Sequence, residues 1–335
     1  MNLKGITMKN ILITGGAGLV GTVLTQGLKD KYNVKILDIK KAEGVESHTG
    51  DISNLDSIIP AFKNIDTVVH LAGDRRVHGD WDSILNNNII GLYNIYEAAR
   101  LSGVKRVVVA IIDPDEKVSG SGIETLRSAG IKVDVGQGSF EATQQLAPYL
   151  HHRSTGRPYV LLKLAATLDG RISAPDGSSN WITGEEARTD AHKLRAESDA
   201  ICVGAGTVRA DNPRLTVRAV DGENPRRIVI GEIPKGAQVE PAESWKGPLK
   251  DLTQKLGNEG VLQLLVEGGA DLAGQLHREG LVDRYVIYVS PSIMGGDDGK
   301  PLLSGAGAAS MEFIKRGRFA NVTQLGEDVR LDLLL

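Results

Sequence analysis

Apolar runs of strand length alternate with amphipathic helical patterns along the first part of the chain. The predicted strands cover Ile11–Thr14, Val34–Asp38, Asp66–Leu71, Arg106–Ile112 and Ile131–Val135, and the predicted helices Leu19–Leu28, Asp82–Leu101, Gly122–Ala129 and residues 139–150. Strands that alternate with helices in this way are typical of a parallel sheet with crossover helices. The run over Arg106–Ile112 is almost wholly apolar, as in a strand covered on both faces. The pattern therefore predicts one continuous parallel sheet in this part of the chain.

The pattern changes after the polar stretch His151–Pro158, whose glycine and proline predict a domain boundary. Beyond it, many short β-rich runs are interrupted by helical patterns at residues 185–197 and 270–279. The predicted strands cover Tyr159–Ala166, Ala200–Val203, Arg227–Ile230, Gln263–Glu267, Tyr285–Pro291 and Arg330–Leu335. We therefore expect two α/β domains, over residues 1–150 and 157–335.

The composition favours a soluble protein that acts on small molecules. Of 335 residues, 41% are hydrophobic and 24% charged, and the net charge of −3 with scattered Lys and Arg argues against nucleic-acid binding. Cys202 is the only cysteine, which excludes an internal disulfide and a zinc site with two thiolates. No apolar stretch approaches the about 18 residues that span a bilayer, and the N-terminus lacks a secretion pattern. We therefore expect a cytoplasmic protein.

A glycine-rich turn lies between the first predicted strand and helix. Gly15, Gly18 and Gly21 have no Cβ, so the backbone can approach a pyrophosphate at the positive helix N-terminus. Asp38 ends the second strand, where a carboxylate can accept hydrogen bonds from both ribose hydroxyls of NAD. The turn predicts dinucleotide binding; a purely structural glycine turn is the alternative.

Residues 8–110 resemble the extended short-chain dehydrogenases of the NAD-dependent epimerase/dehydratase group, and within it the uronate dehydrogenases. Besides the glycines and Asp38, the resemblance implies NAD contacts at Leu19, Val20, Asp51 and Leu71. The family's Tyr-x-x-x-Lys pair should follow the strand at 106–110, but the chain has this pattern only at Tyr159 and Lys163, past the boundary. Oxidation of an alcohol needs a group that takes the hydroxyl proton. We therefore predict that this half has no catalysis of its own.

Residues 103–150 resemble the tail of a riboflavin-pathway zinc deaminase. The resemblance rests on Val107–Ala110, Asp113-Pro114, Gly120, Gly122, Leu126, Ala129–Ile131 and Val133. That family holds zinc with one His and two Cys, with a Glu for proton transfer; this set is absent, so we expect no zinc and no deamination. Because both families use such a strand in a parallel sheet, the join predicts a hybrid Rossmann-like domain.

Residues 157–335 carry five motifs in order: Gly156–Val160, Lys163–Arg171, Asn180–Thr183, Gly206–Pro213 and Val266–Gly269. Together they resemble the reductase domain of the bifunctional riboflavin-biosynthesis deaminase/reductase, which is similar to dihydrofolate reductase. The resemblance implies a dihydrofolate-reductase-like α/β domain that reduces 5-amino-6-(5-phosphoribosylamino)uracil with NADPH, and a homodimer.

The chemistry of several of these residues also suggests a role independently of the resemblance. Gly268 and Gly269 come between an apolar strand and a helix, where backbone amides can face a cofactor phosphate; a tight turn is the alternative. Trp181 can stack on nicotinamide or ribose, or serve as a buried anchor. Arg195 and Arg218 can converge on a phosphate, or lie on the surface.

The resemblance extends the predicted site. It implies NADP contacts at Ala165, Trp181, Thr207, Asp211, Gly269, Ala270, Asp271, Leu272, Ala273, Gly274 and Gln275, and substrate contacts at Ser179, Arg195, Leu215, Arg218 and Glu267. Lys163, Asp169 and Glu267 are candidates for proton transfer, and the sequence does not rank them. Where the family has Asp-Ser, this chain has Gly231-Glu232, and a carboxylate there would repel the 2′-phosphate of NADP. An NAD-dependent sugar epimerase or uronate dehydrogenase, and a non-catalytic NAD-binding protein, are the alternative functions.

Overall fold

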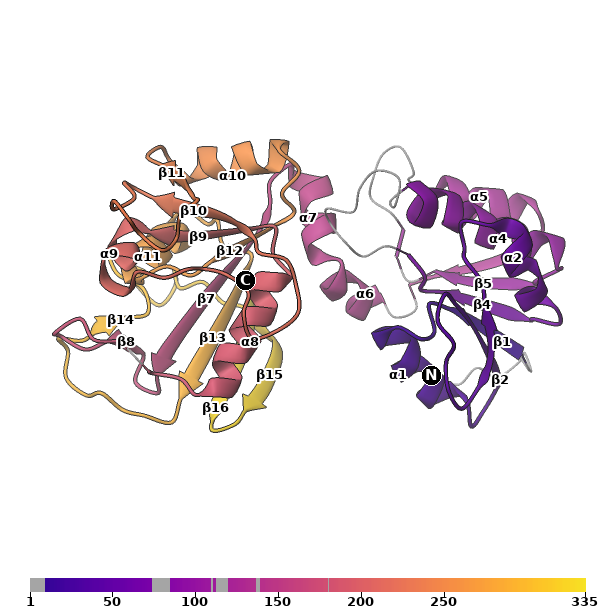
Figure 1. The fold of residues 1–335 in the computed structure, drawn as a ribbon, viewed down its shortest axis with the longest axis horizontal. Helices are drawn as coiled ribbons and strands as arrows, with labels where there is room; N and C mark the ends of the chain where they lie inside the picture. The colour runs from indigo at the N-terminus through magenta and orange to yellow at the C-terminus, as the bar shows by residue number, and fades with distance from the viewer. Residues whose placement is uncertain (1–9, 74–84, 110, 113–119, 137–138, 180) are drawn as a thin grey trace. The chain divides into compact units, whose positions relative to one another are not determined.

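The computed structural model describes residues 10–73, 85–109, 111–112, 120–136, 139–179 and 181–335 (Figure 1). The chain divides into two compact units, residues 1–146 and 147–335. No helix in the described ranges is long and apolar enough to cross a membrane.

Unit 1 contains a six-stranded sheet in the order β3-β2-β1-β4-β5-β6, in which every neighbouring pair is parallel. Its strands are β1 (Asn10–Thr14), β2 (Asn33–Asp38), β3 (Glu46–Thr49), β4 (Thr67–His70), β5 (Arg106–Val109) and β6 (Lys132–Val135). Its helices are α1 (Leu19–Leu28), α2 (Leu55–Ile58), the 3-10 helix η1 (Ile59–Phe62), the π-helix η2 (Leu85–Ile90), α4 (Gly91–Leu101), α5 (Ser121–Ser128) and α6 (Ser139–Gln145). The strand order reverses between β1 and β4, the position where doubly wound sheets bind nucleotides.

Unit 2 contains an eight-stranded sheet in the order β11-β10-β9-β12-β7-β13-β16-β15, parallel from β11 to β13 and antiparallel at β16 and β15. The strands are β7 (Tyr159–Thr167), β9 (Ala200–Gly204), β10 (Arg226–Ile230), β11 (Glu243–Trp245), β12 (Gln263–Val266), β13 (Arg284–Ser290), β15 (Arg318–Leu325) and β16 (Asp328–Leu334), with β8 (Arg171–Ser173) and β14 (Lys300–Pro301) in a small separate sheet. The helices are α7 (Ala147–Thr155), α8 (Glu185–Ala196), α9 (Ala205–Asp211), α10 (Leu249–Asn258) and α11 (Ala270–Arg278).

Helices cover both faces of the central sheet of unit 2, which places one hydrophobic cluster on each side. On one face Leu252 of α10 and Ala273 of α11 pack with Leu264 of β12. On the other face Leu194 of α8 packs with Leu265, the next residue of the same strand. Successive strand residues point to opposite faces, so the two clusters follow directly from the nearly continuous apolar sequence of β12.

The predicted fold class is confirmed in both units, and so is the continuity of the first sheet. β5 pairs in parallel with β4 and with β6, so the sheet continues across the junction between the two family resemblances. Residue 110 of the predicted strand and residues 113–119 after it lie outside the described residues, as do residues 82–84 at the start of the helix predicted from Asp82.

The polar stretch expected as the domain boundary, residues 151–158, is helical up to Thr155. The helix predicted over residues 139–150 is divided into α6 and α7, and α7 continues to Thr155. The reason is contact with unit 2: His152 Nε2 lies 2.9 Å from the carbonyl of Gly257 in α10, and His151 Nδ1 lies 3.6 Å from Asp283. These contacts place α7 in unit 2, so the units divide before Ala147 rather than after residue 150.

Candidate active site

Three charged side chains meet on the α8 face of the unit 2 sheet. Val266 pairs with Leu162, so Lys163 and Glu267 take the next register position on adjacent strands. Arg195, from the last turn of α8, donates from Nε to Glu267 Oε1 at 2.6 Å and from Nη2 to Oε2 at 2.9 Å. Lys163 Nζ lies 3.9 Å from the same carboxylate. Arg195 and Glu267, both predicted substrate contacts, thus form a bidentate ion pair. The proton-transfer candidate Lys163 lies beside this pair.

The electrostatic balance of this cluster keeps Glu267 ionised. Burial opposes the charged carboxylate, but the charges of Lys163 and Arg195 and the Arg195 hydrogen bonds outweigh it and hold the pKa of Glu267 at about 2. The same pairing raises the pKa of Arg195 despite its burial. At neutral pH the cluster therefore holds a carboxylate anion between two cations.

The segment from Leu215 to Arg218 runs beside this pair. Leu215 is buried and has φ of +53°, an uncommon backbone conformation for a leucine. Arg195 Nη1 donates to the Thr216 carbonyl at 3.2 Å, and Arg218 Nη1 donates to the Thr216 hydroxyl at 2.8 Å. Burial and the nearby charge of Arg195 lower the pKa of Arg218. Both arginines therefore donate to Thr216, one to its carbonyl and the other to its hydroxyl.

The structure adds His192, which the motifs did not reveal. Its Nδ1 accepts the backbone N–H of Arg218 at 3.1 Å, and it lies on α8 one turn before Arg195. The sequence signal for it was the His-x-x-Arg spacing, which puts both residues on one face of a helix.

A second group of predicted residues gathers at two helix N-termini. α11 begins after Gly269, whose position has no side-chain cap. A Cβ on Gly269 would lie 3.5 Å from Thr207 Oγ1, so the first turns of α11 and α9 are neighbours. The first amides of an α-helix have no partner within the helix and favour a negative group. The predicted contacts Gly269 and Thr207 are thus close together.

The remainder of the α11 stretch divides into core and surface. Ala270, Leu272 and Ala273 are buried in the hydrophobic core. Gly274 packs against the backbone of Ser304, where a Cβ would come within 2.0 Å of the carbonyl oxygen. Asp271 and Gln275 are exposed. A ligand at this helix would therefore contact the backbone of the first turn and these exposed side chains.

The other predicted contacts of unit 2 occupy different parts of the unit. Ala165 is on β7, two residues beyond Lys163 and on the same face, and Asp211 ends α9 with an exposed side chain. Trp181 is 73% exposed, with the Arg188 guanidinium 4.4 Å from its ring centroid, so it is not the buried anchor of the alternative reading. Ser179 is partly buried, and its neighbour Asn180, part of a predicted motif, lies outside the described residues.

Asp169 holds two loops together. Its carboxylate accepts hydrogen bonds from the Thr167 hydroxyl at 2.6 Å and from the amides of Met294 and Gly295 at 3.1 and 2.7 Å. These donors lower the pKa of Asp169 to about 2. Within the described part of the chain, no hydrogen bond or ion pair joins it to the Glu267 cluster.

The glycine turn of unit 1 has the geometry predicted for it. Gly15 has φ of +69°, and a Cβ there would lie 2.8 Å from the amide nitrogen of Ala72, just after β4. A Cβ on Gly21 would lie 2.4 Å from the Gly15 carbonyl. The amide of Ala17 donates to Asp38 Oδ2 at 3.0 Å, which brings the carboxylate to the turn. The turn therefore needs its glycines for close packing as well as for any ligand.

The neighbouring predicted residues of unit 1 differ in position. Leu71 follows β4, is 39% exposed, and donates its amide to the Thr14 hydroxyl at 3.1 Å. Asp51 accepts the amide of Ser53 at 2.8 Å in the loop after β3. Leu19 and Val20 open α1, directly after the turn.

The Tyr-x-x-x-Lys match belongs to unit 2, as predicted. Tyr159 and Lys163 both lie on β7 rather than on a helix. Burial raises the pKa of Tyr159 to about 12, the opposite of what a proton-accepting tyrosine needs. The match is therefore a coincidence of sequence.

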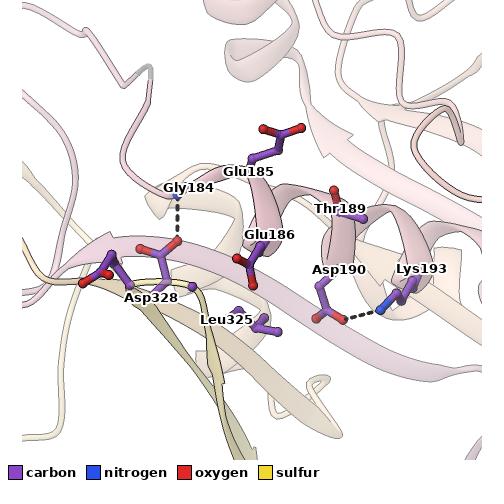
Figure 2. Close-up of a pocket in the computed structure, with 10 residues that line it drawn as sticks. Gly184, Glu185, Glu186, Thr189, Asp190, Lys193, Leu325 and Asp328 are labelled. Atoms are coloured by element: carbon purple, nitrogen blue, oxygen red, sulfur yellow. Dashed lines mark hydrogen bonds and ion pairs between the residues drawn. The ribbon is translucent and has the colours of Figure 1, made fainter.

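An acidic hollow of about 650 Å³ lies beside α8 (Figure 2). The amide of Gly184 donates to Asp328 at 2.7 Å, and Lys193 lies 3.8 Å from Asp190. The lining residues are Gly184, Glu185, Glu186, Thr189, Asp190, Lys193, Leu325, Gly326, Glu327 and Asp328. None of them was a predicted site residue, and the described part of the chain contains no cluster of three or more His, Cys, Asp or Glu able to hold a metal.

Comparison with known families divides the chain as the sequence motifs do. The family described as RibD C-terminal domain matches residues 158–331. The NAD dependent epimerase/dehydratase family matches residues 11–111. Both family resemblances predicted from the motifs, to the reductase domain and to the epimerase group, are thereby confirmed.

Individual relatives extend this result. The riboflavin biosynthesis protein RibD of Chlamydia muridarum is 42% identical in an alignment 240 residues long, which covers 60% of this chain and 64% of that protein. The structure of Acinetobacter baumannii RibD, form 1, has a TM-score of 0.63 at 33% identity and covers 71% of this chain and 75% of its own. A Thermotoga maritima structure named as a diaminohydroxyphosphoribosylaminopyrimidine deaminase/5-amino-6-(5-phosphoribosylamino)uracil reductase has a TM-score of 0.61 at 28% identity, covering 71% and 74%. These shares exceed residues 158–331, so the similarity extends into the chain before residue 158.

Proposed function

The chain belongs to the RibD C-terminal domain family, and from this premise we propose that unit 2 reduces 5-amino-6-(5-phosphoribosylamino)uracil with NADPH. The product would carry an open ribityl chain in place of the ribosyl group. The observation that carries the proposal is the buried Arg195–Glu267 ion pair with Lys163 beside it. This cluster can position a polar, phosphorylated sugar at one fixed place on the sheet.

The residues at the start of α11 fit a cofactor phosphate. Gly268 and Gly269 leave the helix entrance without side chains, and the Gly269 position offers no internal cap. Thr207 lies beside it and can donate its hydroxyl to the same group. When bound there, NADPH supplies the hydride for C1 of the sugar. Glu232 is exposed, and its carboxylate lies 3.8 Å from Lys246 Nζ. We propose NADPH rather than NADH as the hydride donor.

The substrate would be held by the Glu267 cluster and Arg218. Both Glu267 oxygens accept hydrogen bonds from Arg195 and keep further lone pairs that can accept from a sugar hydroxyl or an amino group. Arg195 is occupied with Glu267 and Thr216, whereas Arg218 contacts only Thr216 among the side-chain bonds described. We therefore assign the phosphate mainly to Arg218, with Arg195 ordering the carboxylate.

Lys163 is the best proton donor of the three candidates. With pKa values of about 2, Glu267 and Asp169 carry no proton to give at neutral pH. Lys163 carries an ammonium group 3.9 Å from Glu267 and faces the same side of the sheet. We propose that Lys163 protonates the ring oxygen when the sugar opens, or the nitrogen when hydride reaches C1, and regains its proton from water.

The test is NADPH oxidation by the purified chain in the presence of the pyrimidine. We expect NADPH oxidation that depends on the pyrimidine. Its rate should fall about a hundredfold or more in Lys163→Met, Arg195→Ala and Glu267→Ala. Lys193→Met is the matched control, because its side chain lies on the outer flank of α8 and is 57% exposed. Wild-type rates in Arg195→Ala or Glu267→Ala would remove the assigned roles.

We also propose that unit 1 binds NAD without turning it over, because the amide of Ala17 fixes Asp38 beside the glycine turn. Calorimetric titration should show NAD binding by the wild type and none by Gly18→Asp. A Cβ at this position would lie 3.2 Å from the Gly15 carbonyl oxygen, and the aspartate would add a negative charge where the phosphate is expected. Gly27→Asp on the same helix is the control, because its Cβ meets no atom within 4 Å. Unchanged binding in Gly18→Asp would refute the site, and oxidation of uronate would show that the dehydrogenase alternative is right.

Cytoplasmic location and a homodimer formed through the unit 2 sheet are further proposals that rest on family membership. A monomeric mass in solution light scattering would refute the dimer.

A further inference from the structure

The inner face of α8 carries a histidine that the proposed chemistry leaves without a role. His192 is 9% exposed and lies three residues before Arg195, so both side chains leave the helix on the same side. Arg195 donates hydrogen bonds to the Glu267 carboxylate and to the Thr216 carbonyl. His192 Nδ1 accepts the amide N–H of Arg218 at 3.1 Å. One face of α8 therefore holds both the carboxylate and the segment that carries Arg218.

The hydrogen bond requires a neutral imidazole. Nδ1 can accept only when it carries no proton, which leaves the proton on Nε2. The charged groups that face the ring are Arg195 on the same helix, Arg218, Lys163 on β7 and Glu267 after β12. Burial and the neighbouring arginines lower the pKa of His192 below its ordinary value. The bond is therefore present at neutral pH and is lost as pH falls through that lowered pKa.

The segment that His192 holds depends on such contacts for its shape. Leu215 has φ of +53° and is buried, which anchors one end. The amide of Val217 donates to Asn224 at 2.7 Å. The amide of Arg218, the next residue along the chain, donates to His192 Nδ1. Without this acceptor the amide would lose its hydrogen bond.

We propose that His192 is a positioning residue: its neutral ring holds the backbone of Arg218 so that the guanidinium meets the anionic end of the substrate beside Arg195. The inference rests on the proposed function of unit 2. It makes His192 a determinant of substrate affinity, acting through Arg218, rather than a group that reacts.

Two replacements separate this role from simple packing. In His192→Asn, the Oδ1 atom can take the place of Nδ1, whereas His192→Phe fills the space and cannot accept. We expect KM for the pyrimidine to rise about tenfold in the Phe variant with kcat changed less than about threefold, and the Asn variant to stay near wild type. His48→Asn in unit 1 is the matched control. An unchanged KM in the Phe variant, or equal losses in both variants, would overturn the proposal.

The pH dependence supplies a readout that packing would not move. As pH falls from neutrality through the lowered pKa of His192, KM of the wild type should rise relative to KM of His192→Asn, because only the wild type has a ring to protonate. Titration of the substrate phosphate affects both proteins alike and cancels in the ratio. A ratio that does not change with pH would contradict the proposal.

A spectroscopic measurement keeps the inference testable if the Phe variant does not fold or the wild type does not turn over. Nitrogen chemical shifts of the wild-type histidines, with the His192 signal assigned by its loss in His192→Asn, should show the proton on Nε2 at neutral pH. A proton on Nδ1 would overturn the positioning role. Absent turnover with the proton on Nε2 would instead refute the proposed function and leave the hydrogen bond supported.

Discussion

Replacing Glu267 by glutamine removes the anion at the centre of the cluster and keeps the shape of the side chain. Arg195 and Lys163 would then face each other without the carboxylate that pairs with both. Removing one partner of a buried ion pair is destabilising because the remaining charge loses both water and its partner. We therefore expect Glu267→Gln to lower the free energy of unfolding of unit 2 as well as activity.

The magnitude follows from the pKa of Glu267. The structure holds it at about 2, against an ordinary value of 4.5, which corresponds to about 3 kcal/mol of stabilisation by the charged form. Because the folded pKa is lowered, this contribution is complete above about pH 4.5 and is lost as pH falls towards 2. The difference between wild type and Glu267→Gln should thus be about 3 kcal/mol at pH 7 and about 1 kcal/mol near pH 3.

Urea unfolding followed by tryptophan fluorescence measures this difference, since Trp181 and Trp245 both lie in unit 2. Glu259→Gln is the matched control: Glu259 pairs with Arg226, but it is 39% exposed and should contribute less than about 1 kcal/mol. The reasoning is refuted if Glu267→Gln is as stable as the control variant at pH 7, or if its deficit does not shrink in acid.

Three further predictions concern packing, loop contacts and the single thiol. Gly274→Ala should lower the free energy of unfolding by about 1–3 kcal/mol in thermal melts, because its Cβ would meet the Ser304 carbonyl at 2.0 Å; an unchanged melting temperature would contradict this. Asp169→Asn should keep kcat within about tenfold of the wild-type value, because the Asp169 carboxylate holds the loop amides rather than the substrate. A loss of kcat as large as that of Lys163→Met would show that Asp169 is a proton donor. Cys202, whose pKa burial raises to about 12, should react with iodoacetamide only after unfolding, and rapid labelling of the native protein would show that the thiol is accessible.

Much of the fold was predictable because its elements have local causes. The helix over Leu19–Leu28 was predicted with its observed bounds, since glycines precede it and its apolar residues follow a helical period. β15 was missed because its residues are mostly exposed and it lies at the sheet edge, where no apolar run marks it. α7 was missed as part of unit 2 because its contacts with Gly257 and Asp283 are far away in sequence.

The arrangement of the candidate site could not be predicted from the sequence. Motifs pointed to Arg195 and Glu267, yet nothing in the sequence states that they form a bidentate pair, because 72 residues separate them. His192 lacks a motif of its own, and its function is set by a single backbone amide on another segment. The ranking of Lys163 above Asp169 also required structure, since only the contacts of each carboxylate fix its charge.

The central claim is that hydride reaches the sugar in unit 2, beside the Arg195–Glu267 pair. The most direct measurement incubates the purified chain with the pyrimidine substrate and NADPH deuterated at both C4 positions, and locates the label in the product by mass spectrometry and NMR. We predict one deuterium at C1 of the ribityl chain, with formation of labelled product suppressed in Arg195→Ala. Product without deuterium, or oxidation of NADPH that does not depend on the pyrimidine, would contradict the account.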